Sequence, residues 1–266
     1  MWRPFYLSGM IVGGALLIAR PPQTCEPSVT AGGARRMIGG LMSTMSAMCT
    51  NYRATRSDLE QLSRQSGLDF DQGLGDWKPD IWPDYDAPAL LATDAGTESV
   101  MGRYGFWPKS LQPERRNAAG KKMQPYSTYN SRSEEVGSKR LYAAAWRAGQ
   151  RCLIPAAYVV EPCWETGKNV WHKCGLIDGE PFAVAGLWKR YETKDGPITG
   201  VTMLTVNAEG HAVMGRMHRP ADEKRSVVLL RPADFDEWLH STNAEAARSM
   251  LQLLPAEEMR ADPILG

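Results

Sequence analysis

The run Cys152-Leu153-Ile154-Pro155-Ala156-Ala157-Tyr158-Val159-Val160-Glu161 decides the fold class of this chain. Every residue of it but the last is apolar, and short apolar runs bounded by turn residues are typical of buried strands. Three more runs of this kind follow, separated by turn residues: Pro181–Trp188, Val201–Val206 and Ser226–Leu230. Regular alternation of strand and helix is lacking. These runs therefore predict an α+β fold around a mainly antiparallel, barrel-like sheet.

The remaining elements are expected to flank this sheet. Two earlier runs, Pro88–Thr93 and Val100–Trp107, have the character of strands. Residues 67–87 and 109–127 are rich in Gly, Pro and polar side chains, which indicates loops. Helices are predicted at four places: residues 58–62 behind a Thr55/Ser57 cap, Glu134–Ala148, Pro232–Leu239 and Ala244–Leu253.

Composition and charge narrow the function. The chain has 266 residues, 43% of them hydrophobic, and a formal net charge of +1. Residues 1–48 hold four Arg and one Glu, a net of +3, so the remainder carries −2. This balance excludes a nucleic-acid binder that is strongly basic over the whole chain. If the protein binds a polyanion, the contact must come from a local cluster of basic residues. The apolar run Leu7–Ala19 is too short to span a bilayer.

The cysteines predict neither a disulfide framework nor a metal site. There are five of them, at positions 25, 49, 152, 163 and 174, and no Cys-x-x-Cys occurs. An odd, sparse set in a chain of this length indicates a reducing compartment. We interpret Cys152, Cys163 and Cys174 as buried small hydrophobic residues, and we expect no metal and no cofactor.

The pair Met48-Cys49 stands where organised globular sequence begins. Residues 1–48 have three interpretations: upstream sequence translated from a misplaced start, a signal or targeting segment, or a pro-segment removed to expose Cys49. In each case residues 49–260 form the functional domain. A free N-terminal Cys49 is a 1,2-aminothiol, whose amine has an ordinary pKa of about 7.7–8.0. Such a group can form a Schiff base with an aldehyde and then close a thiazolidine.

Three other features carry candidate chemistry. Tyr129–Glu134 is a polar run between a basic loop and a predicted helix. Glu161 ends an apolar strand, where partial desolvation suits a carboxylate to proton transfer, although an edge-strand Glu facing water fits the pattern equally. His218 lies in Met217–Pro220, where a histidine bound to a backbone carbonyl is the alternative.

In combination these residues resemble the SRAP (SOS-response-associated peptidase) family, whose members shield abasic sites in single-stranded DNA. Six blocks in order carry the resemblance. Met48–Tyr52 is similar to the family's M-C-x-x-[YF] start, Arg103–Pro108 to its R-W-G-L-x-P segment and Asn130–Glu134 to its N-A-R-x-E motif. Further on, Arg151–Trp164 is similar to its R-C-L-x-P and E-W stretches, Pro181–Trp188 to its F-x-x-A-G-L-W strand and Thr205–Ala208 with His218 to its T-x-x-A…H segment.

The resemblance implies roles for individual residues. Cys49 would supply amine and thiol to the aldehyde of an abasic deoxyribose, and Asn130 would position Cys49 and the sugar. Glu161 would act as acid and base beside the Cys49 amine, and His218 would hydrogen-bond or protonate the opened sugar. Arg132 would hold a phosphate next to the lesion.

The chain departs from the family at two places. Asn51 stands where many relatives carry Arg. Between His218 and the next apolar strand, either Arg219-Pro220 or Arg225-Ser226 matches the family's R-x-P, with an apparent insertion at Ala221–Lys224.

The segment 107–132 predicts the DNA contact. It holds six cations and one acid, Glu114, with three aromatic residues between them. Cations and stacking platforms are what single-stranded DNA binding uses, whereas the alternative is a solvated loop without a ligand. The expected DNA-binding residues are Trp107, Lys121, Lys122, Tyr129, Arg132 and Arg219.

The sequence thus predicts a monomeric, cytoplasmic, nucleoid-associated protein whose partner is single-stranded DNA with abasic sites, and no membrane. The predicted activity is thiazolidine crosslinking, with strand cleavage by β-elimination as a side activity. Two alternatives stay open: an N-terminal-nucleophile thiol peptidase that removes its own residues 1–48, and a DNA-binding module without chemistry.

Overall fold

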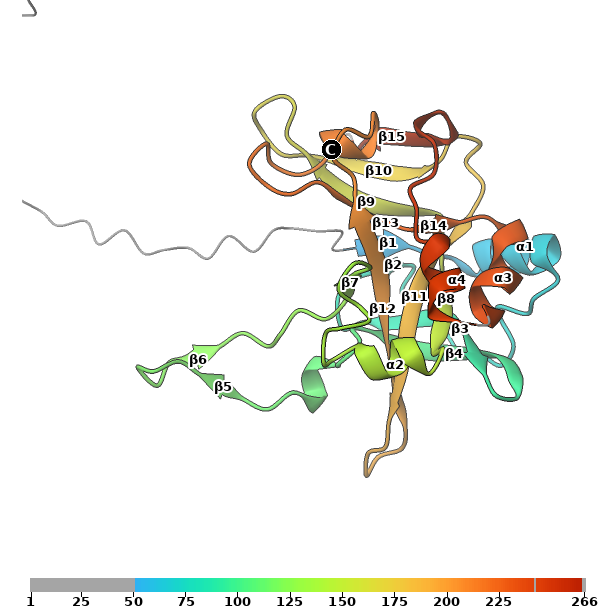
Figure 1. Cartoon of the computed structure of the whole chain (residues 1–266), viewed down its shortest axis with the longest axis vertical. Helices are drawn as coiled ribbons and strands as arrows, with labels where there is room; N and C mark the ends of the chain where they lie inside the picture. Colours follow the sequence, from blue (N-terminus) through green and yellow to red (C-terminus); the bar gives the residue numbers. More distant parts are fainter. Residues whose placement is uncertain (1–50, 242, 265–266) are drawn as a thin grey trace, which may run out of the picture. The chain divides into compact units, whose positions relative to one another are not determined.

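The computed structural model describes residues 51–241 and 243–264 (Figure 1). The predicted extension 1–48 and Cys49 lie outside the described residues.

The strands form two sheets and a separate hairpin. The first sheet is antiparallel throughout, in the order β15 (Met259–Pro263), β10 (Val170–Leu176), β9 (Tyr158–Cys163), β1 (Asn51–Arg53) and β2 (Asp80–Ile81). The second runs in the order β13 (Arg225–Val227), β12 (Ile198–Asn207), β4 (Gly96–Tyr104), β3 (Asp86–Thr93), β8 (Arg151–Ala156), β11 (Phe182–Tyr191) and β14 (Leu229–Leu230). An eighth strand, β7 (Asn130–Arg132), pairs with β12.

The second sheet closes on itself through β12. This strand pairs antiparallel with β11 and parallel with β4, so β12, β4, β3, β8 and β11 form a closed ring. The β12–β4 and β12–β7 ladders are the parallel pairs among the described strands. The predicted α+β fold with a mainly antiparallel sheet is therefore confirmed, and the sheet takes the form of this ring.

The run that opened the sequence analysis supplies a strand to each sheet. Residues 151–156 form β8 in the ring, and residues 158–163 form β9 in the other sheet. Ala157 lies at the junction, and its backbone N–H donates to the carbonyl of Arg53 at 2.7 Å. Both halves are buried, so the run has the uniform apolar character of a single strand. The expectation of one strand is thus wrong at this junction.

The helices are short and three of the four predictions hold. α1 (Arg56–Ser66) begins at a capping box formed by Thr55 and Asp58, and ends at Gly67, whose φ of 76° suits glycine. α3 (Phe235–His240) follows the 3₁₀ turn η3 (Pro232–Asp234), and α4 (Ala244–Ser249) follows the cap Asn243. Three further 3₁₀ turns are η1 (Lys109–Leu111), η2 (Met214–Arg216) and η4 (Ala256–Glu258).

The predicted helix Glu134–Ala148 is wrong over most of its length. Only α2 (Ala143–Arg147) is helical, and the preceding residues form successive turns. Gly137 and Ser138 are weak helix formers, and the Glu134 carboxylate bonds Arg225 and the N–H of Asn207. Tertiary contacts therefore override the local periodicity.

Large aromatic side chains of the ring strands and of α3 are buried in the core. Tyr104, Phe106 and Trp238 are fully buried, and the indole of Trp238 donates to the carbonyl of Cys152 at 2.9 Å. β12 passes so close to residues 105–106 that a Cβ on Gly200 would collide with the carbonyl oxygen of Phe106. This approach fixes the segment that leads to Trp107.

The predicted loop 109–127 contains a short hairpin of β5 (Arg115–Arg116) and β6 (Lys122–Met123), which extends away from both sheets (Figure 1). Among the helices of the described residues, none is long and apolar enough to cross a bilayer.

Candidate functional site

Glu161 and His218 form a buried pair. Oε2 of Glu161 lies 3.5 Å from Nε2 of His218, and both side chains are 1% exposed. Nε2 also lies 3.2 Å from the carbonyl oxygen of Arg225. Both neighbours of Nε2 are acceptors when Glu161 is ionised, so in that state Nε2 carries a proton, whether the imidazole is neutral or charged. Burial excludes the alternative of a Glu161 side chain that faces water. Nε2 of His218 has both the Arg225 carbonyl and the Glu161 carboxylate as neighbours.

The backbone at His218 is held in an uncommon conformation. Its φ is 64°, and its N–H donates to the carbonyl of Pro162 at 2.6 Å, which bridges the loop to β9. Lys224 folds back on this loop: its Nζ donates to the carbonyl oxygens of Met217 (2.9 Å), His218 (3.2 Å) and Arg219 (2.8 Å). The Lys224 ammonium thus holds His218 against the end of β9.

Sequence reasoning missed Lys224. It lies in the apparent insertion 221–224 and is buried, although lysine is among the residues least often buried. No sequence motif identifies Lys224, because its contact with the carbonyl of His218, six positions earlier, forms only where the chain folds back on itself.

Arg225, whose carbonyl oxygen contacts His218, also makes side-chain contacts of its own. The buried guanidinium donates to Glu134 (2.7 Å), Glu223 (2.8 Å) and the carbonyl oxygen of Thr205 (2.6 Å). Partial burial acts to raise the pKa of Glu134, but the hydrogen bond and charge of Arg225 together with backbone hydrogen bonds outweigh it, so that the pKa lies below its ordinary value. Glu134, the last residue of the Asn130–Glu134 motif, therefore helps to hold Arg225, the neighbour of His218, in position.

Asn130 is buried at the start of β7, which pairs with β12. The hydroxyl of Tyr104 donates to its Oδ1 at 3.5 Å. The Tyr104 ring contacts Tyr129 and Tyr52, with centroids 5.6 Å and 5.2 Å apart. Tyr52 in turn pairs with Val159, two residues before Glu161. A chain of tyrosine rings therefore links the strand of Asn130 to the strand of Glu161.

The predicted phosphate-binding arginines have different surroundings. Arg132 is 40% exposed and is paired with Glu223 and, at 3.7 Å, with Glu135. Arg219 is exposed, and its guanidinium lies 4.7 Å from the ring centroid of Trp164. A phosphate at Arg132 must therefore share the guanidinium with carboxylates, whereas Arg219 presents its charge at the surface.

The remaining predicted DNA-binding residues lie on or beside the hairpin. Lys121 and Lys122 are exposed, and Lys122 pairs with Glu114 at 3.0 Å. Trp107 stacks on Tyr126 with centroids 6.3 Å apart and an interplanar angle of 15°. Glu114 also pairs with Arg116, so the single acid of the loop neutralises part of its positive charge.

The cysteines that the structure describes are free thiols in the interior. Burial raises the pKa of the Cys152 and Cys174 thiols, which keeps both protonated and unreactive. Within residues 51–241 and 243–264 no group of three or more His, Cys, Asp or Glu side chains is arranged to hold a metal.

Comparison with known proteins places the chain in a family. The profile of the SOS response associated peptidase (SRAP) family matches residues 48–265. A solved structure of a protein from Bordetella bronchiseptica is 31% identical, with a TM-score of 0.68 over 82% of this chain and 100% of that one. A protein from Bacteroides thetaiotaomicron shares the fold at 15% identity, with a TM-score of 0.60 over 82% and 92% of the two chains. A phage-related protein from Bordetella bronchiseptica does so at 17% identity, with a TM-score of 0.56 over 81% and 94%.

No curated protein is similar enough in sequence to count as a match. The family profile covers most of the chain in one continuous stretch, and it includes every candidate site residue described above. The chain therefore belongs to the SOS response associated peptidase (SRAP) family.

Proposed function

We propose that this protein, starting at Cys49, binds single-stranded DNA and forms a thiazolidine crosslink with abasic sites. Membership of the SRAP family supports a role in DNA binding and abasic-site processing in general. The observation that carries the finer proposal is the buried pair of Glu161 and His218, with 3.5 Å between carboxylate and imidazole. A buried carboxylate beside an imidazole is suited to proton transfer near neutral pH.

The strand pairing supports the placement of the aminothiol near this pair. Asn51, the first described residue, pairs with Val160, the neighbour of Glu161. Cys49 precedes Asn51 by two residues, and two residues span at most about 7 Å. This short separation allows the amine of a chain that starts at Cys49 to approach the Glu161 carboxylate, as the proposed reaction requires.

The proposed reaction joins an aldehyde and an aminothiol and releases one water. The Cys49 amine attacks C1′ of the open-chain sugar, one of its protons passes to the former carbonyl oxygen to give the carbinolamine hydroxyl, and Glu161 accepts the second proton that the nitrogen loses. Protonation of the carbinolamine hydroxyl by the same carboxyl releases water and leaves a Schiff base. The Cys49 thiol then adds across the C=N bond: its sulfur bonds C1′, and the proton that it loses ends on the thiazolidine nitrogen.

Ring closure also explains how a crosslink can protect the strand. A Schiff base acidifies the C2′ proton, and loss of that proton expels the 3′ phosphate by β-elimination. Addition of the thiol removes the C=N bond and so stops this side reaction. Asn130 and His218 are proposed to hold the opened sugar, and Arg132, Arg219 and the 107–132 segment to hold the strand.

The test uses purified protein that starts at Cys49 and a single-stranded oligonucleotide with one abasic site. We expect an adduct that survives heating in denaturant, and none from unprocessed protein that retains residues 1–48. An equally strong adduct from unprocessed protein would contradict the proposal, because an internal cysteine has its nitrogen in an amide. Release of residues 1–48 without any adduct on DNA would instead favour the thiol peptidase.

A further inference from the structure

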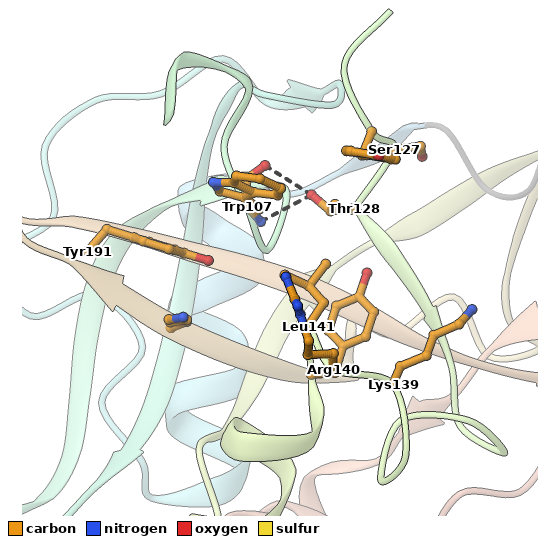
Figure 2. A pocket seen from close by; sticks show the side chains of 10 residues that line it. Trp107, Ser127, Thr128, Lys139, Arg140, Leu141 and Tyr191 are labelled. Atoms are coloured by element: carbon orange, nitrogen blue, oxygen red, sulfur yellow. Dashed lines mark hydrogen bonds between the residues drawn. The ribbon is translucent and has the colours of Figure 1, made fainter. Parts of the chain in front are cut away.

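A cleft of about 710 Å³ lies beside the segment that leads into β7. Figure 2 shows Trp107 and Thr128 on one side of it, Arg140 and Leu141 on the other, and Tyr191 at one end. Its volume is within the range of about 300–1,000 Å³ that is usual for small-ligand sites. None of its residues takes part in the Glu161–His218 pair.

Hydrogen bonds hold the Tyr191 side chain and the backbone of Trp107 at the cleft. The hydroxyl of Tyr191 donates to the carbonyl of Phe106 at 2.9 Å. The backbone N–H of Trp107 donates to Oγ1 of Thr128, and that hydroxyl donates to the carbonyl of Trp107, both at 3.1 Å. Gln112 ties the same segments together, because its Nε2 donates to the carbonyl of Trp107 at 2.7 Å and to that of Tyr126 at 3.1 Å. A ligand therefore meets a surface that needs little ordering.

Cations line the rim of the cleft. Its lining includes Lys139, Arg140 and Lys189 and no carboxylate. Lys139 is paired with Glu135, which lies outside the lining. Arg140 and Lys189 are exposed, and Nζ of Lys189 lies 5.0 Å from the ring centroid of Tyr191. Flat aromatic walls with a cationic rim match a nucleotide, whose base stacks and whose phosphate is anionic.

We propose that this cleft binds one nucleotide of the single strand, next to the abasic site. The base packs against Tyr191 and Leu141, and its phosphate meets Arg140 and Lys189. The inference rests on the proposed function, because it places the lesion sugar at Asn130, two residues after Thr128 along the chain. The cleft reads no sequence, since every base offers a stacking face.

The test places 2-aminopurine on either side of the lesion, in oligonucleotides with an abasic site and in intact ones. Stacking in the cleft quenches 2-aminopurine, so we expect quenching at one flanking position with the Cys49-initiated protein. Tyr191→Leu should abolish the quenching and weaken binding of the intact strand by about 5- to 150-fold. Trp171→Leu, which changes an exposed aromatic residue of β10, is the matched control and should change neither.

A second variant keeps the proposal testable if Tyr191→Leu does not fold. Arg140→Gln with Lys189→Gln should flatten the slope of log K against log salt by about 1.4, if both contact phosphates. Wild-type crosslinking without quenching at either flank, or with an unchanged slope in the double variant, would overturn the inference. Quenching on the intact strand without any adduct would refute the proposed crosslinking and retain the cleft as a nucleotide site.

Discussion

The ammonium group of Lys224 donates a hydrogen bond to the backbone carbonyl of His218, at 3.2 Å. It bonds the two flanking carbonyls as well, so one buried cation spans the whole turn in which His218 has a positive φ. The histidine ring is thereby held where its Nε2 meets Glu161.

Lys224→Met should slow adduct formation by about 10- to 100-fold, because small misplacements of a reacting group have effects of this size. DNA affinity should stay the same, since Lys224 is buried. Rates and affinities measured separately across pH test this, with the exposed Lys168→Met as control. Lys224→Arg, which keeps the charge, should recover part of the rate. A Lys224→Met protein with the wild-type rate and pH profile would show that the loop around His218 keeps its conformation without Lys224.

Cys49→Ser and Cys49→Ala should lose the heat-stable adduct and keep DNA binding. Either variant retains an N-terminal amine, so a transient Schiff base should still be trapped by borohydride reduction. Without the thiol the C=N bond persists, and strand cleavage by β-elimination should increase relative to wild type. Denaturing gels with and without borohydride measure both. A heat-stable adduct from Cys49→Ala without borohydride would point to another attachment residue.

Glu161→Gln should slow both formation and reversal of the adduct by about 10²-fold or more. The amide keeps the shape of the carboxylate but cannot accept or release a proton. The matched control is Glu165→Gln, which removes an exposed carboxylate paired with Arg216 close to the end of the same strand. Adduct rates that are unchanged between about pH 5 and 8 in Glu161→Gln would leave this residue a structural role.

Replacing Lys121 and Lys122 together by Gln should flatten the slope of log K against log salt by about 1.4, if both contact phosphates. Lys122 is also paired with Glu114, so a smaller change would locate the effect mainly in Lys121. The control replaces Lys78 and Lys173, two exposed lysines of other segments. A double variant with the wild-type slope would show that these two lysines of the hairpin do not contact the DNA.

Trp107→Ala provides the complementary measurement on the same segment. Its loss should weaken binding by about 1–3 kcal/mol with little change in the slope, because stacking releases no counterions.

Glu134→Gln should lower the free energy of unfolding only above acidic pH. The folded pKa of Glu134 lies below its ordinary value of 4.5, so its ion pair with Arg225 stabilises the fold above that value. The stabilisation is lost as the pH falls through the folded pKa. The difference should stay below about 1 kcal/mol, because the Glu134 side chain is 49% exposed. Denaturant unfolding at neutral and acidic pH tests this, and a difference that persists at the lowest pH would contradict the ion pair.

The elements that could be predicted from the sequence are those that a local apolar run and its flanking turn residues determine. The apolar runs that became β3, β11 and β12 were found to within about three residues at each end, because apolar character and turn residues mark them, whereas the run at β4 was placed three to four residues too late. The junction at Ala157 was missed because both halves of the run are buried, in different sheets. The predicted helix over 134–142 was wrong because Arg225, ninety-one residues after Glu134, draws the Glu134 carboxylate into a tertiary contact.

The same distinction between local pattern and tertiary contact applies to the residues of the candidate site. Glu161 and His218 were named from their motifs, and their contact arises only when the loop after η2 reaches β9. Lys224 and the Tyr191 side of the cleft have no sequence signal, because their roles come from residues that meet only in three dimensions.

The arrangement of β12 has a consequence for the order of assembly during synthesis. This strand bonds to β4, β7, β11 and β13, which are drawn from residues 96–227. A chain emerging from the ribosome therefore cannot close its ring before residue 207, and His218 joins Glu161 later still. The N-terminal residues of the domain are made about 170 residues earlier, so an aminothiol at Cys49 would wait through most of translation without the two groups that we propose to move its protons.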